Sequence, residues 1–152
     1  MDEIEIIADG IKALYNTASE QISKGRYDEA EEVFNTIERT VEVLGYKEGI
    51  GMVRVSLANL SMMRGNILDA LTHMEVAKEN YSPGENMRAA CDTQTKISLI
   101  ALEIGMKKEN DGDLEGALEL FEKILPNLNE KRAAAVAGEI ENIKRYLEGN
   151  AQ

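Results

Sequence analysis

Apolar residues recur along the chain at steps of three and four, the spacing that places them on one face of an α-helix. In the first segment the residues with this spacing are Ile4, Ile7, Ile11, Leu14, Ala18 and Ile22. They predict a helix over about residues 3–24, for which Asp2 is a suitable N-cap. Further helices are expected over about residues 27–44, 47–64, 67–80, 85–110, 114–125 and 129–148. The chain is therefore predicted to be all-α, with seven helices.

Three segments of the chain align without gaps: GRYDEAEEVF (25–34), GNILDALTHM (65–74) and GDLEGALELF (112–121). Each begins with glycine and has alanine five residues later and Phe or Met nine residues later. A small residue also lies seven residues before each glycine, at Ala18, Ala58 and Gly105. Small residues let two antiparallel helices approach closely, and glycine can end the first helix in the left-handed conformation. The alignment predicts three helical hairpins over about residues 3–44, 47–80 and 85–125.

This order of small residue, glycine turn, alanine and phenylalanine resembles the tetratricopeptide repeat (TPR) family, in a subclass with longer repeats. The resemblance covers about residues 3–126. It implies a TPR-like α-solenoid of three hairpins, closed by a capping helix at about residues 129–148, with residues 1–152 forming a single domain. The chain departs from the family where a first-helix tryptophan is expected, since Leu14, Arg54 and Ala101 occupy those positions.

The resemblance also implies a partner-binding surface. In TPR domains the first helices of successive hairpins line a concave groove that receives an extended peptide or a helix. The aligned residues here are Tyr15, Ser19, Ile22, Met52, Val55, Asn59, Met62, Leu99, Leu102 and Met106, flanked by Lys12 and Glu109. Within each helix they share one face, and methionine side chains adapt to apolar or amphipathic segments.

We therefore expect a protein–protein interaction module, a TPR adaptor or scaffold that binds a peptide or helix of another protein. An alternative is that the same apolar face builds a homo-oligomer, such as a homodimer, or is covered by the chain itself, because a large exposed apolar patch favours association.

Composition narrows the choice of partner. The net charge of -11 and the pI of about 4.6 disfavour binding to nucleic acid or to anionic lipid. No apolar run approaches the roughly 18 residues of a membrane span, and the N-terminus is acidic where a signal peptide would be basic. We expect a cytoplasmic protein with neither nucleic-acid nor membrane partners.

One segment resembles a calcium-binding loop. DGDLEGALELFE (111–122) places Asp111, Asp113, Glu115 and Glu122 at positions one, three, five and twelve of an EF-hand loop, so a calcium-binding helical domain is a lesser alternative. The repeat register accounts for the same segment without a metal. Phosphate-loop, nucleophile-elbow and triad patterns are missing from the sequence. We therefore expect neither catalysis nor a cofactor nor a bound metal.

Overall fold

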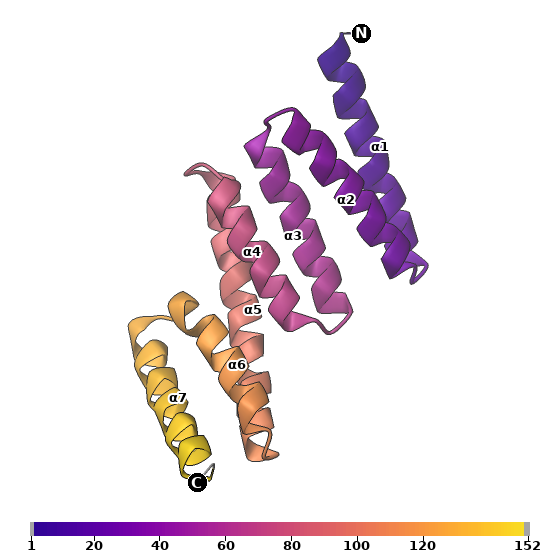
Figure 1. The fold of residues 1–152 in the computed structure, drawn as a ribbon. Helices are drawn as coiled ribbons and strands as arrows, with labels where there is room; N and C mark the ends of the chain where they lie inside the picture. Colours follow the sequence, from indigo (N-terminus) through magenta and orange to yellow (C-terminus); the bar gives the residue numbers. More distant parts are fainter. Residues whose placement is uncertain (1, 151–152) are drawn as a thin grey trace. The chain divides into compact units, whose positions relative to one another are not determined.

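The computed structural model describes residues 2–150 (Figure 1). The chain divides into two compact units, residues 1–90 and 91–152. The elements in chain order are α1 (Glu3–Ser23), α2 (Tyr27–Val43), α3 (Lys47–Met63), α4 (Ile67–Asn80), α5 (Glu85–Asn110), α6 (Leu114–Ile124), the short 3-10 helix η1 (Leu125–Asn127) and α7 (Glu130–Asn150). The described residues thus confirm an all-α fold with seven α-helices. The single domain expected over residues 1–152 stays a prediction.

The helix boundaries lie within two residues of those expected, because glycine residues stand at the turns between paired helices. Gly25, Gly65 and Gly112 follow the first helix of each aligned pair and have φ angles of +74°, +77° and +88°. Residues other than glycine rarely adopt this left-handed backbone conformation. At the start of α1, the Asp2 carboxylate accepts a hydrogen bond of 2.8 Å from the Glu5 N–H, which confirms the predicted N-cap.

The first unit is built from helices that pack against their neighbours in sequence. α1 contacts α2, α2 contacts α3 and α3 contacts α4 (Figure 1). The small residues of the aligned columns lie inside: Ala18, Ala30, Ala58 and Ala70 are completely buried. Ala18 and Ala30 belong to one apolar cluster that also contains Phe34. The burial of these alanines is what the close approach of paired helices requires.

Two tyrosine rings lie directly against the backbone of α3. A Cβ atom on Gly51 would come within 2.4 Å of the Tyr81 ring, and one on Gly49 within 2.5 Å of the Tyr46 ring. Glycine inside a helix weakens it by about 1 kcal/mol relative to alanine. The space that these glycines leave for the two rings offsets that cost.

Glu48, directly before Gly49, fixes the turn that follows α4. Its carboxylate accepts hydrogen bonds from the Ser82 backbone N–H at 2.8 Å and from Asn86 Nδ2 at 3.2 Å. Both bonds lower the pKa of Glu48. The start of α3 and the start of α5 are therefore tied together within the first unit.

The second unit contains residues 91–110 of α5 together with α6, η1 and α7. α5 and α6 meet at Gly105, where an added Cβ would come within 2.6 Å of the Phe121 ring. α7 packs on α6 and η1, and its apolar residues Val136, Ile140 and Ile143 are buried.

We expect Gly105→Ala to destabilise the protein although alanine is the better helix former. The Phe121 ring is buried and cannot move aside, so overpacking of about 1–3 kcal/mol outweighs the gain of about 1 kcal/mol in helix propensity, for a net loss of about 1 kcal/mol. Gly138→Ala on α7 is the matched control, because open space surrounds that position, and it should stabilise by about 0.5–1 kcal/mol. Urea unfolding of both variants measures the difference, and equal stabilisation would contradict the close approach at Gly105.

Candidate functional site

The predicted binding residues of the first unit lie on α1 and α3. On α1, Ser19 is exposed, whereas Tyr15 and Ile22 are half-buried and pack partly on the core. On α3, Met52 and Asn59 are exposed, and Val55 and Met62 are half-buried. Since the four α3 residues share one side of the helix, α3 presents a partly apolar surface that the described chain leaves uncovered.

Tyr15 contributes a polar group to the predicted face of α1. Its ring lies 6.1 Å from the Phe34 ring, centroid to centroid. Burial, with smaller effects of Tyr81 and Tyr46, raises the pKa of Tyr15 to about 12. The hydroxyl therefore remains protonated and able to donate a hydrogen bond to a partner at neutral pH.

In the second unit, α5 carries Leu99, Leu102 and Met106. Leu99 is half-buried, and the other two open into a hollow of about 240 Å³. The hollow is lined by Leu102, Met106 and Glu109 of α5, Phe121 of α6, and Arg132, Ala135, Val136 and Glu139 of α7. Two of the predicted binding residues are thus brought together with side chains of the last helix.

Glu109 and Glu139 mark the end of this hollow and also line a second one, of about 430 Å³. The second hollow continues along the same helices and includes Leu114, Asn142 and Tyr146. Burial raises the pKa of Glu109, and the hydrogen bond and charge of Glu139 raise it further. The two hollows therefore meet at a pair of carboxyl groups.

The residues of α7 that line these two hollows could not be predicted from the sequence. The capping role predicted for residues 129–148 does not place charged residues of this helix in a binding site. A usable signal exists, however. Glu139 lies directly before the buried Ile140 and three residues after the buried Val136, so it borders the apolar stripe.

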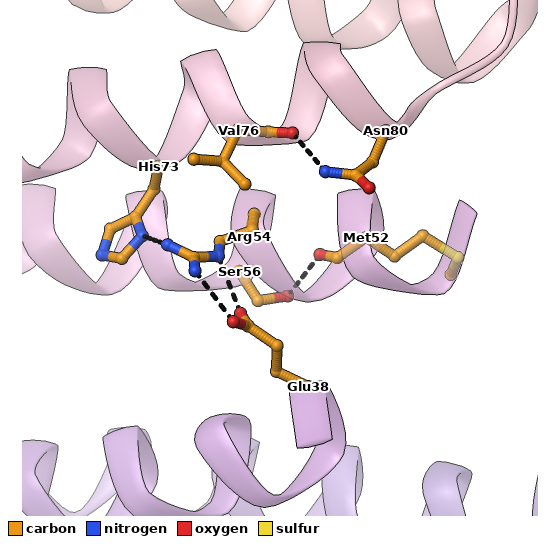
Figure 2. A network of polar contacts seen from close by, with 7 residues as sticks. All are labelled: Glu38, Met52, Arg54, Ser56, His73, Val76 and Asn80. Atoms are coloured by element: carbon orange, nitrogen blue, oxygen red, sulfur yellow. Dashed lines mark hydrogen bonds and ion pairs between the residues drawn. The ribbon is translucent and has the colours of Figure 1, made fainter. Parts of the chain in front are cut away.

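A second polar cluster ties α2, α3 and α4 together in the first unit (Figure 2). Arg54 of α3 reaches Glu38 of α2: Nη2 donates to Oε1 at 2.8 Å, and Nε lies 2.7 Å from Oε2 in an ion pair that lacks hydrogen-bond direction. Arg54 Nη1 lies 3.1 Å from Nδ1 of His73 on α4. Arg54 therefore connects an acidic side chain of α2 with a histidine of α4.

The protonation of His73 follows from its partner. Arginine stays protonated and can only donate, so Nδ1 of His73 must accept and the ring proton must lie on Nε2. Burial, followed by the nearby charge of Arg54, lowers the pKa of His73 below its ordinary value of 6.5. His73 is therefore a neutral structural partner of Arg54 rather than an isolated surface residue.

The acidic residues of the segment that resembles a calcium-binding loop have other partners. The Asp113 carboxylate caps α6 by accepting from the Gly116 N–H at 2.9 Å and lies 3.3 Å from the Lys108 ammonium. Glu122 lies 3.6 Å from the Lys144 ammonium. Among residues 2–150, no group of three or more His, Cys, Asp or Glu side chains could hold a metal ion. Nor does any helix in that range have both the length and the apolar character needed to cross a membrane.

No protein-family model and no curated protein matches this sequence. We therefore infer function from the residues of the chain and their contacts.

We expect Glu38→Ala to lower the free energy of unfolding by about 2 kcal/mol, less than the loss of a fully buried pair, because Arg54 is left half-buried without its carboxylate. The double variant Glu38→Ala with Arg54→Leu should recover about half of this loss, since leucine needs no partner. Urea unfolding of the single and double variants measures the coupling, and simple additivity would rule out an energetic role for the pair.

The His73 pKa makes stability dependent on pH in one direction. In the unfolded chain His73 has a pKa of about 6.5, whereas in the folded chain its pKa is lower. The neutral ring therefore adds to the free energy of unfolding. This stabilisation is complete above about pH 6.5 and is lost as the pH falls toward the folded-state pKa. Since the sequence has a single histidine, NMR titration reads its pKa directly. Arg54→Leu should raise that pKa, and an unchanged value would show that Arg54 does not act on the ring.

Proposed function

We propose that this chain is a non-catalytic, cytoplasmic protein–protein interaction module, built as a TPR-like solenoid, that binds a peptide or helix of another protein. Three observations support the repeat. The aligned glycines all adopt left-handed angles, the aligned alanines are buried, and Gly105 meets Phe121 as the register requires. The net charge of -11 supports a protein partner over nucleic acid or anionic lipid.

The observation that carries the proposal is that the side chains of the expected binding face keep surface accessible to solvent. None of the ten residues of this face is buried in the described chain. Met52 is 45% exposed and Met106 is 52% exposed, while Met74, at a core position of the repeat, is completely buried. The chain can therefore bury methionine where packing demands it. The exposure of Met52 in the first unit and of Met106 in the second indicates apolar surface available for contact in each unit.

Self-association is the second candidate, and a separate observation favours it. At the other end of the chain, Ile7, Val43 and Leu44 line a shallow depression of about 370 Å³ between α1 and α2. Val43 is 88% exposed. Apolar groups this open to water favour contact with another surface, which a second copy of the chain could provide.

Two charged substitutions on α5 test the binding face. Short peptides are selected from a random library against the purified chain, and their affinities are measured for Leu102→Glu and Met106→Glu. We expect each to weaken binding by about tenfold or more, because a charge would have to be buried against the peptide. Ile100→Glu is the matched control: Ile100 is also exposed on α5, but residues two apart on a helix do not share a face.

The same variants separate the two candidates. Light scattering over a range of concentrations reports whether the chain is monomeric. With Val43→Glu added to the set, a dimer that this variant dissociates would support self-association through the α1–α2 depression, whereas a monomer that retains its peptides in both charged α5 variants would contradict the binding face.

A further inference from the structure

The two hollows together form a groove between α5 and α7. This groove is apolar along its length and has Glu109 and Glu139 at its middle. On one side of the carboxyl pair, Leu102 and Met106 line the smaller hollow; on the other side, Leu114 and Ile143 line the larger one. Glu109 and Glu139 line both. A ligand that fills the groove must therefore be apolar on both sides of a polar centre.

Glu109 is half-buried and Glu139 is exposed, and a hydrogen bond joins their two carboxyl groups. Two carboxylates held this close repel one another when both are ionised, and one of them is driven toward its neutral form. Burial raises the pKa of Glu109, and the hydrogen bond to Glu139 and then the negative charge of Glu139 raise it further. A cation between the two groups would remove the repulsion and form charge-assisted hydrogen bonds to both.

We propose that this groove binds a segment of a partner protein by placing one lysine or arginine of that segment between Glu109 and Glu139, with apolar residues of the segment in the two flanking hollows. The inference rests on the proposed interaction function and specifies the chemistry of the partner. Long basic side chains suit such a place because their methylene groups pack on apolar surface while the charged end reaches polar groups.

The charge of Arg132 in the groove favours one orientation of the bound segment over the other. Arg132 lines only the smaller hollow, so it disfavours a second basic residue on that side. Asn142 lines the larger hollow and can pair with the polar backbone of the segment there. A free small cation would leave both hollows unfilled, whereas a peptide with a single basic residue fills both and satisfies the carboxyl pair.

The experiment uses random peptides selected against the full chain at physiological salt. Selected sequences are resynthesised with a fluorescent label, once as found and once with the basic residue replaced by norleucine, which keeps the methylene groups and removes the charge. Anisotropy titrations compare the chain, the double variant Glu109→Gln with Glu139→Gln, and the control Glu148→Gln. Glu148 is exposed and nine residues beyond Glu139, which places it on the opposite side of α7.

We expect the selected peptides to carry a lysine or arginine flanked by apolar residues. Norleucine in that position and the double glutamine variant should each weaken binding by about tenfold, and together they should weaken it no further than either alone. Glu148→Gln should change nothing. Thermal unfolding should show that the double variant folds, since Glu139 is exposed, Glu109 is half-buried and two amides can still hydrogen-bond to each other.

Two results overturn the inference in distinguishable ways. Peptides without a basic residue, sensitive to Leu102→Glu but not to the glutamine variant, would leave the interaction module standing and refute the role of the carboxyl pair. Failure to select any peptide, or a dimer that Met106→Glu dissociates, would refute the peptide-binding function and this inference together.

Discussion

The close approach of paired helices is the constraint on which the structure depends. It is visible at Gly51 and Gly105, where aromatic rings occupy the space that any side chain would fill. Two helices that approach so closely cannot slide or rotate without a clash, since protein interiors are packed as densely as organic crystals. The side that each helix shows to solvent is therefore determined by which of its residues are small. The uncovered methionines of α3 and α5 and the groove beside α7 follow from that choice.

The helices themselves could be predicted almost completely from the sequence, because the signals are local. A glycine in the left-handed conformation ends a helix whatever lies elsewhere in the chain, and the spacing of apolar residues defines the buried side. The stripe at Val136, Ile140 and Ile143 could be read in this way. The alanines at 18, 30, 58 and 70 could be placed inside because the same register occurs three times.

The polar contacts could not be predicted, because each joins residues from different helices. Arg54 meets Glu38 and His73 only after α2, α3 and α4 have packed, and nothing near Arg54 in sequence reveals either partner. The contact between Glu109 and Glu139 is unpredictable for the same reason. Whether the two residues face one another depends on how α7 is rotated about its axis relative to α5. Of these two residues, the sequence places only Glu109 beside the predicted binding face and gives no role to Glu139. A charged residue at a position that a repeat family fills with tryptophan is the clearest signal that could have pointed to Arg54.

The tyrosine rings on α3 have a consequence for how the chain folds. With glycine at positions 49 and 51, the first turn of α3 has weak intrinsic helicity, and a short helix of this kind is marginal in water by itself. The turn becomes stable once Tyr46 and Tyr81 cover it, and Tyr81 comes from the far end of α4. Nucleation of α3 and docking of α4 are thus coupled steps, so that this hairpin forms cooperatively rather than by the association of two preformed helices.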